Sequence, residues 1–279
     1  MPELPEVETV KNALKKAIVG AKILNTEVFC RRFRMTIPEN FEEAITGATI
    51  VDVKRIAKYI LISLHNNQNI IWHLGMSGKI KTFATDDVEL QKHDHLVIKT
   101  DKCTLVYNDA RRFGMVTVCE SNNLENFSVF QNIGKDPFDE TLTADYLLLK
   151  FKNKRIAIKV VLLDQSIING IGNIYASEAL YLAKILPQRE ALTLTKQECE
   201  TLIESVREVL EKAIKAGGST LRDYIKPDGS TGYFQNQHCV YNKTGKPCPE
   251  CVCNLSKTKG IRKIVQAGRS TFYCETLQK

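Results

Sequence analysis

The chain has 279 residues, a formal net charge of +7, 43% hydrophobic residues and 25% charged residues, which is the composition of an ordinary globular protein of one or two domains. It has no apolar run of about 18 residues and no charged segment leading into an apolar one, which argues against a membrane span and a secretory signal. We therefore expect a cytoplasmic protein without a membrane partner.

The chain begins Met1-Pro2-Glu3-Leu4-Pro5-Glu6, and the small residue after Met1 favours its removal. Pro2 would then carry the terminal amine, and because such amines titrate near roughly 7.7–8, part of it would be nucleophilic at cellular pH. Its attack on an aldehyde-like carbon would give an iminium ion, with Glu3 beside it to move protons. The alternative is that two prolines merely stiffen a loose terminus.

Two kinds of pattern follow in the first half of the chain. Residues 5–18 have apolar side chains at helical spacing, and Gly20 ends this predicted helix. A helix packed on a core would hold Pro2 and Glu3 in place at its start. From residue 21 to about 119, short β-rich runs separated by turn signals predict a β-sandwich or a barrel-like domain.

From about residue 124 the hydrophobic period becomes helical. Thr195 and Glu198 have the spacing of a capping box before a predicted helix that Gly217-Gly218 ends. The turn at residues 169–173, Asn-Gly-Ile-Gly-Asn, lies between two helical stretches. It fits either a helix-turn-helix with amides aimed at phosphate or a plain α-hairpin, and both interpretations stay open.

The last segment, residues 231–279, is basic and rich in cysteine. Residues 243–279 carry eight Lys or Arg against two acids and so supply six of the seven net charges, which suits contact with phosphates. Nine cysteines in a chain without an export signal are expected to be reduced. Cys248 and Cys251 form a zinc half-site that Cys274 could complete, so the segment predicts a β-ribbon zinc module.

Four further stretches are ordinary when taken singly: 55–59 (Arg-Ile-Ala-Lys-Tyr), 73–78 (His-Leu-Gly-Met-Ser-Gly), 92–95 (Lys-His-Asp-His) and 108–114 (Asn-Asp-Ala-Arg-Arg-Phe-Gly). Lys58 would then be a solvated strand lysine, and Met76 and Phe113 would be core residues. Taken together and in this order, these stretches closely resemble those of the bacterial formamidopyrimidine-DNA glycosylase family and its endonuclease VIII-like relatives. Leu4 resembles the formamidopyrimidine branch. The other matching stretches are 2–9, 172–178, 217–220 and 267–271.

The resemblance covers the whole chain and implies an α+β multidomain enzyme. It implies an N-terminal catalytic β-sandwich domain with flanking helices at 1–124, a helix-two-turns-helix DNA-binding domain at 125–230 and a zinc-finger-like β-ribbon at 231–279. The implied function is base excision repair of oxidised purines, 8-oxoguanine and formamidopyrimidines, by a DNA glycosylase that is also an abasic-site lyase. Its partner would be damaged double-stranded DNA with one nucleotide flipped out. The resemblance further implies a monomer of the bacterial cytosol without an obligate protein partner.

The resemblance also implies roles for single residues. Pro2 would attack C1′ of the damaged nucleotide, Glu3 would act as acid and base, and Lys58 would donate a proton during β-elimination. Arg269 would hold phosphate and serve δ-elimination. The side chains expected to contact DNA are those of His93, Arg111, Lys154 and Asn173. Those expected to fill the gap left by the flipped base are Met76, Arg111 and Phe113.

The tail departs from the family, whose ribbon has two Cys-x-x-Cys pairs. Here the second pair reads Cys274-Glu275-Thr276-Leu277, so a leucine replaces the fourth thiol. Structural zinc takes four ligands. We expect one structural Zn²⁺ held by Cys248, Cys251, Cys274 and Cys253. The alternatives are a fourth ligand from His238 or Cys239, or a ribbon without zinc.

Three other functions stay open. An endonuclease VIII-like glycosylase would prefer oxidised pyrimidines. A catalytically silent damaged-DNA-binding protein would have lost Pro2, Glu3 or Lys58, and all three are present. An RNA-binding zinc-ribbon protein would need a stripe of stacking aromatic residues, whereas the aromatic residues here, 8% of the chain, form none.

Overall fold

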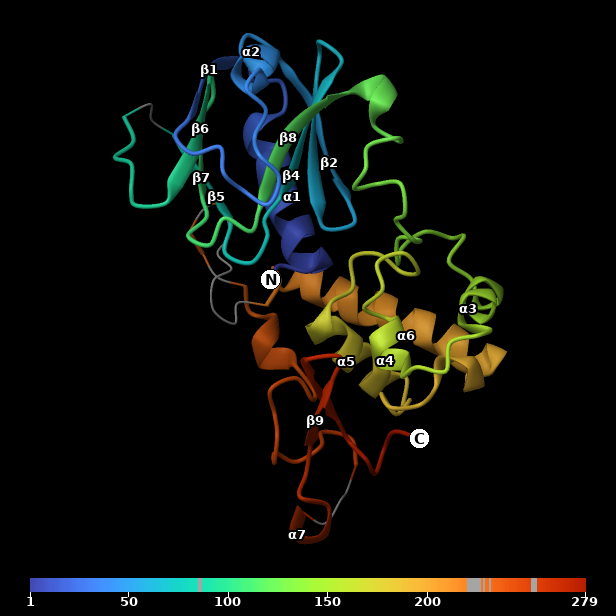
Figure 1. The fold of residues 1–279 in the computed structure, drawn as a ribbon. Coiled ribbons are helices and arrows are strands. Elements are labelled where there is room, and N and C mark those ends of the chain that lie inside the picture. The colour runs from blue at the N-terminus through green and yellow to red at the C-terminus, as the bar shows by residue number, and fades with distance from the viewer. Residues whose placement is uncertain (85–86, 220–226, 228, 231, 252–254) are drawn as a thin grey trace. The chain divides into compact units, whose positions relative to one another are not determined.

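A computed structural model of the protein describes residues 1–279 except 85–86, 220–226, 228, 231 and 252–254 (Figure 1). The chain divides into two compact units. The sandwich unit comprises Met1–Gln131 and Ile214–Gln235, and the helical unit comprises Asn132–Ala213 and Asn236–Lys279. The three expected domain boundaries stay a prediction.

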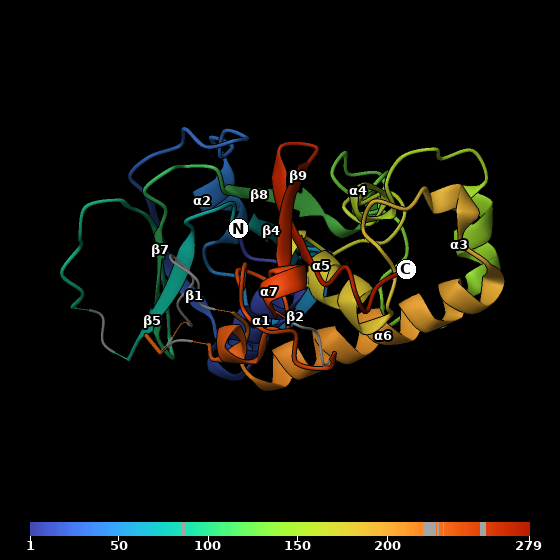
Figure 2. The same ribbon diagram turned by 90° about the horizontal axis from the view of Figure 1, so that it is seen from below.

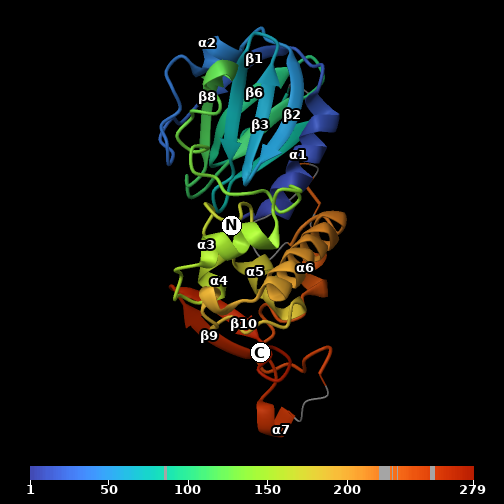
Figure 3. The same ribbon diagram turned by 90° about the vertical axis from the view of Figure 1, so that its right-hand side faces the viewer.

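The sandwich unit contains two four-stranded antiparallel sheets, which confirms the predicted β-sandwich (Figure 3). One sheet has the order β1 (Ile23–Val28), β6 (Asp94–Thr100), β7 (Thr104–Asn108), β5 (Lys79–Phe83). The other has the order β2 (Ile50–Ile56), β3 (Tyr59–Leu64), β4 (Gln68–His73), β8 (Met115–Glu120). Their apolar faces form one core, in which the rings of Trp72 and Tyr107 meet edge to face at 5.0 Å.

Strands β3 and β4 are apolar on both faces, because a second cluster covers the side away from the main core. That cluster buries Leu61 and Ile71, and residues from the segment 124–130 pack against it. This double burial explains why the sequence of these strands is a continuous apolar run rather than an alternation. A short 3-10 helix, η1 (Ser121–Asn123), follows β8 just before that segment.

Helix α1 (Leu4–Ile18) confirms the helix predicted for residues 5–18. Its apolar residues recur on one face and are buried against the sandwich core, together with the short helix α2 (Phe41–Ile45). The chain leaves α1 through Gly20, whose φ of 76° lies in the left-handed region that glycine adopts without strain. The expected flanking helices are therefore present.

The helical unit contains α3 (Ala144–Phe151), α4 (Ile158–Val161), α5 (Asn173–Leu182), the 3-10 turn η2 (Ala191–Thr193) and most of α6 (Lys196–Lys215) (Figure 2). The 169–173 turn connects α4 to α5. Helix α6 is amphipathic, with one face of buried apolar residues. Gly217 and Gly218, with φ of 77° and 81°, follow α6 as predicted. A 3-10 turn, η3 (Phe234–Gln237), precedes the ribbon.

The C-terminal segment confirms the predicted β-ribbon. Strands β9 (Arg262–Gln266) and β10 (Arg269–Tyr273) pair antiparallel around a tight turn at Ala267-Gly268, and the short helix α7 (Leu255–Thr258) precedes them. Its small core includes Val240, Ile261 and Phe272, together with Tyr181 of α5. The ribbon is therefore packed onto α5 rather than held by its hairpin alone.

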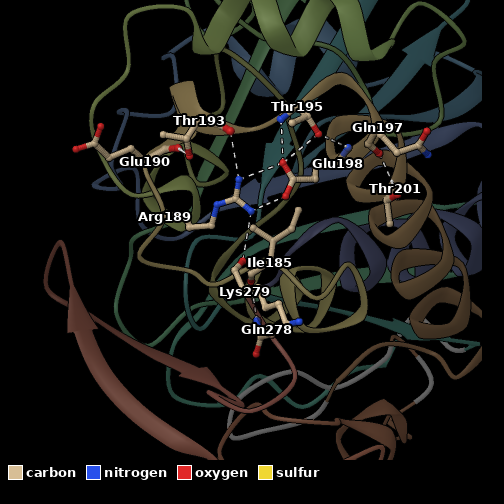
Figure 4. A network of polar contacts seen from close by, with 10 residues as sticks. All are labelled: Ile185, Arg189, Glu190, Thr193, Thr195, Gln197, Glu198, Thr201, Gln278 and Lys279. Atoms are coloured by element: carbon tan, nitrogen blue, oxygen red, sulfur yellow. Dashed lines mark hydrogen bonds and ion pairs between the residues drawn. The ribbon is translucent and has the colours of Figure 1, made fainter.

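The predicted capping box at the start of α6 is confirmed and belongs to a larger polar network (Figure 4). Thr195 N donates to Glu198 Oε2 at 2.9 Å, and Glu198 N donates to Thr195 Oγ1 at 3.3 Å. Arg189 Nη2 donates to the same carboxylate at 3.1 Å, and Arg189 Nη1 donates to the carbonyl of Lys279 at 3.3 Å. Hydrogen bonding to Arg189, although burial opposes it, holds the pKa of Glu198 at about 2.

Glu198→Gln should lower the free energy of unfolding at pH 7 by about 1–2 kcal/mol, because it weakens a capping box and a partly exposed ion pair. The depressed pKa of Glu198 means that its contribution is full above about pH 4.5 and is lost as the pH falls towards 2. Thermal unfolding at several pH values measures this. Glu204→Gln, an exposed site on the same helix, is the control. An equal loss at pH 7 and pH 2 would contradict the ion-pair explanation.

Candidate active site

Pro2 and Glu3 are buried at the start of α1, whereas Met1 is 49% exposed. Glu3 N donates to Glu6 Oε2 at 2.8 Å, and the other oxygen of the same carboxylate accepts from Ser219 N at 2.7 Å. Glu6 is itself buried, at 2% exposure. This clamp, formed by Glu6 on Glu3 and Ser219, overturns the interpretation of a loose terminus.

Lys58 lies on the tight turn between β2 and β3, where Ala57 has a φ of 53°. Lys58 is only 7% exposed, so the interpretation of a solvated strand lysine is wrong. The end of β2 is tied to α1 by Arg55, whose Nε lies 2.8 Å from Glu8 Oε2 and whose Nη1 donates to the carbonyl of Ala57 at 3.0 Å. This pair fixes the Lys58 turn with respect to the helix that begins beside Glu3.

Asp109 joins two loops that carry candidate residues. It is fully buried, and its carboxylate accepts hydrogen bonds from Ser77 Oγ, from Arg111 N at 3.3 Å and from Gly114 N at 2.9 Å. The loops 74–78 and 109–114 are therefore held against each other. Their approach is close enough that a Cβ at Gly75 would lie 2.4 Å from Gly114 N, so only glycine fits there.

These joined loops present apolar side chains outward. Met76 is 36% exposed and Phe113 is 48% exposed, so the interpretation of both as core residues is wrong. The guanidinium of Arg111 stacks over the Phe113 ring at 4.6 Å from its centroid. Exposed apolar side chains on a rigid support can enter a gap in another molecule with little loss of conformational entropy.

His73, at the end of β4, is a buried neutral histidine. Burial first, and then the charges of Arg34 and Lys58, lower the pKa of His73 to about 4. Its Nδ1 accepts from Gly75 N at 3.0 Å, which leaves the proton of the neutral ring on Nε2. A neutral donor is thus available beside the 74–78 loop across the cellular pH range.

Asn173, the first residue of α5, is held from three sides within the helical unit. Its Nδ2 donates to the carbonyl of Ser270 at 2.8 Å and lies 3.4 Å from the hydroxyl of Tyr241, while its Oδ1 accepts from Lys159 Nζ. Ser270 follows Arg269, which is exposed at the start of β10. The expected DNA-contact residue Asn173 and the expected phosphate residue Arg269 are therefore brought together by one hydrogen bond.

Lys159 is a residue that the sequence interpretation missed. Its side chain is completely buried on α4, and its amine bonds Asn173. The signal was a lysine inside an otherwise apolar run, 156–161. The predicted Lys154 lies in the loop before α4, where its side chain is 34% exposed and its Nζ is 3.9 Å from Asp164 Oδ2.

A buried carboxylate also connects α5 to the start of the ribbon. Glu178, 3% exposed, accepts from the backbone N–H groups of Cys239, Val240 and Tyr241 at 2.7, 3.0 and 2.7 Å. Burial raises the pKa of Glu178, although these three hydrogen bonds oppose the shift. The ribbon is therefore positioned by α5 independently of any metal.

Three cysteine sulfurs meet at the base of the ribbon. The Sγ atoms of Cys248, Cys251 and Cys274 all lie within 4.8 Å of one another, a group that could hold a metal ion. The Sγ atoms of Cys251 and Cys274 are 3.5 Å apart, and the hydroxyl of Tyr181 lies 3.2 Å from Cys248 Sγ. Thiolates bound at about 2.3 Å to a tetrahedral zinc lie about 3.8 Å apart, so this spacing fits.

The fourth position of that group differs from the pattern expected for four thiols. Leu277 packs against the ribbon core beside the cluster. The expected fourth ligand, Cys253, lies outside the described residues. Among the residues that the structure does describe, neither His238 nor Cys239 joins the three sulfurs.

None of the described helices combines the length and the apolar character needed to cross a membrane.

Two family models match the chain: the formamidopyrimidine-DNA glycosylase N-terminal domain over residues 1–116 and the formamidopyrimidine-DNA glycosylase H2TH domain over residues 133–224. The curated formamidopyrimidine-DNA glycosylase of Rickettsia canadensis is 43% identical, covering 100% of this chain and 99% of its own. That of Bartonella henselae is 42% identical over 100% of both chains.

Solved structures match this chain over nearly its full length. Lactococcus lactis Fpg in complex with DNA containing an abasic site is 37% identical with a TM-score of 0.89, covering 99% of each chain. The wild-type protein of that organism with DNA containing N7-benzyl-Fapy-dG is 38% identical, and with DNA containing an oxidised pyrimidine it is 37% identical. Both have a TM-score of 0.89 over 100% of each chain.

Proposed function

Since this chain belongs to the formamidopyrimidine-DNA glycosylase family, we propose that it excises oxidised purines from double-stranded DNA and cleaves the resulting abasic site. The observation that carries this proposal is the buried Pro2-Glu3 pair, whose backbone the Glu6 carboxylate anchors at 2.8 Å. A terminal amine attacks one carbon only if it is held in place, and this clamp provides that constraint. The solved relatives bound to lesion-containing DNA support the substrate class.

The proposed reaction begins when the amine of Pro2 attacks C1′ of the damaged nucleotide and the base departs with a proton supplied through Glu3. Opening of the sugar ring gives an iminium ion between Pro2 and C1′. The iminium withdraws electrons, so a 2′ hydrogen becomes acidic, and its loss expels the 3′ phosphate by β-elimination. Lys58, held on its turn beside α1, supplies a proton in this step. Arg269 holds phosphate and assists the second, δ-elimination.

The place of the flipped nucleotide would be filled by Met76, Arg111 and Phe113. Their exposure and the Asp109 anchor beneath them support this assignment, because apolar wedges separate base steps and arginine can bind base edges. Asn173, His93 and Lys154 would contact the DNA backbone. We further propose a monomer of the bacterial cytosol that needs no obligate protein partner.

A second substrate class has its own support. The Lactococcus lactis relative has been solved with DNA containing an oxidised pyrimidine. We propose that this chain nevertheless prefers oxidised purines, because Leu4 matches the formamidopyrimidine branch. Cleavage of duplexes that carry 8-oxoguanine opposite cytosine, compared with thymine glycol duplexes, distinguishes the two preferences.

Borohydride should trap the protein covalently on 8-oxoguanine duplex DNA, because it reduces the iminium formed by Pro2. Pro2→Gly replaces the secondary amine by a primary amine and should give a weaker adduct, whereas an uncleaved N-terminal tag should abolish it. Pro5→Ala, which changes the other proline of the same turn, should still crosslink. Gel analysis measures the amount of adduct formed by the unchanged protein, the tagged protein and the two variants. Normal trapping of the tagged protein would exclude Pro2 as the nucleophile.

Backbone contact by Lys154 should appear in the salt dependence of binding. Each phosphate neutralised contributes about −0.9 to the slope of log K against log salt, so Lys154→Gln should flatten that slope by about one unit without changing the preferred lesion. Lys212→Gln removes an exposed lysine that pairs with Glu208 and is the control. Equal slopes for Lys154→Gln and the unchanged protein would remove Lys154 from the interface.

We propose that the ribbon holds one structural zinc ion, with Cys253 as the fourth ligand. The three clustered thiols support this proposal, as does the Tyr181 hydroxyl, which hydrogen-bonds one of them as outer groups do around metal ligands. The ion would stabilise the ribbon that carries Arg269, because zinc binding and folding of such modules are coupled. No reaction step depends on it.

Purified protein should contain close to one equivalent of zinc. Cys253→Ser should lose that zinc to a chelator faster than the unchanged protein, whereas Cys199→Ser, a buried cysteine on α6, should retain it. Elemental analysis during chelator titration gives both results. A zinc content near background would mean a ribbon without metal, and unchanged retention in Cys253→Ser would remove that residue from the site.

A further inference from the structure

A second cationic site lies on the edge of the sheet that ends in β5. A pocket of about 390 Å³ is lined there by Lys79, Lys81, Gln91, Lys92 and Asn108. Lys79 and Lys81 alternate with the buried Ile80 on β5, so both lysines project from the same face. Asn108 is the register partner of Lys79, and β5 and β7 lie side by side (Figure 1).

The described lining of the pocket is basic: three of its residues are lysines and none is an acid. Asp94, whose side chain is 2% exposed, lies close to one of these lysines, Lys81. The oxygens of Asp94 are already engaged: Oδ1 accepts from Asn108 Nδ2 at 2.7 Å, and Oδ2 accepts from Gln91 N at 2.8 Å. Lys81 Nζ is 3.6 Å from Oδ1. Asp94 therefore offsets part of the charge of Lys81, and the described lining of the pocket stays basic.

The third lysine is presented by a rigid turn. His93 has a φ of 75°, and the turn is closed by a hydrogen bond from Asp94 N to the carbonyl of Gln91 at 3.0 Å. Asn108 Nδ2 donates to the carbonyl of Lys92 at 3.1 Å, and Asp109 N donates to that of His93 at 3.0 Å. The backbone under Lys92 is thus fixed to β7.

We propose that this pocket binds a backbone phosphate of the DNA duplex, away from the damaged nucleotide. The proposal rests on the proposed function, because Lys92 is joined to the expected DNA-contact residue His93, and β5 directly follows the loop that presents Met76. Ammonium groups bind phosphate as point charges, and such contacts set position and register on the duplex without selecting a sequence.

The test combines a protein variant with modified DNA. In an abasic-analogue duplex, each phosphate in turn is replaced by a neutral methylphosphonate, and affinity is measured for the unchanged protein and for the triple variant Lys79→Gln, Lys81→Gln, Lys92→Gln. The unchanged protein should lose affinity at one position where the triple variant loses none. On unmodified DNA the triple variant should flatten the salt slope by about 0.9, so that between 50 and 200 mM salt its affinity falls about 3.5-fold less.

Lys16→Gln is the control, because it removes an exposed lysine near the other end of α1. Its slope should equal that of the unchanged protein. The proposal is overturned if no methylphosphonate position depends on the three lysines, or if the triple variant keeps the original slope. A slope change near three would mean three separate phosphate contacts and would also overturn a single pocket. Borohydride trapping of the unchanged protein distinguishes failure of the pocket from failure of the proposed function. If the unchanged protein is trapped but the triple variant keeps its salt slope, only the pocket is excluded. If the unchanged protein is not trapped, the proposed function itself is excluded.

Discussion

The chemistry assigned to this chain depends on immobilising a chain terminus, which is normally the loosest part of a protein. The Glu6 carboxylate does this by accepting from Glu3 N with one oxygen and from Ser219 N with the other. Charge-assisted bonds of this kind are each worth about 1.5–3 kcal/mol. Ser219 lies 213 residues along the chain from Glu6, so the terminus is fixed by a segment far away in sequence.

The same device recurs beneath the other candidate residues. Asp109 accepts from two backbone N–H groups of its own loop and from the Ser77 hydroxyl of the 74–78 loop, and these loops present Met76 and Phe113 to solvent. Glu178 accepts three backbone N–H groups and positions the ribbon on α5. A buried carboxylate without partners would be costly, and these have several each. Such anchors allow loops to be both irregular and rigid, which is what a wedge into DNA or a held phosphate contact requires.

Electrostatics complement this rigidity. The neutral His73 does not add to the positive charge of Arg34 and Lys58, because burial and those same charges lower its pKa to about 4. The lysine pocket on β5, by contrast, gathers positive charge at the surface, where we propose that a phosphate binds. The sandwich unit therefore combines a neutral buried histidine beside Arg34 and Lys58 with a basic pocket at the β5 edge.

Local sequence was sufficient for α1, for the capping box at Thr195 and Glu198 and for the β-ribbon, because periodicity and caps depend on neighbours within a few residues. The ordered motifs also identified the family. Only the tertiary structure decided that Lys58 is buried and that Met76 and Phe113 are exposed, since burial depends on segments far apart in the chain. The bond from Lys159 to Asn173 and the gathering of three lysines around one pocket could likewise not be predicted from the sequence. Sequence determines which groups exist, and folding decides which of them meet.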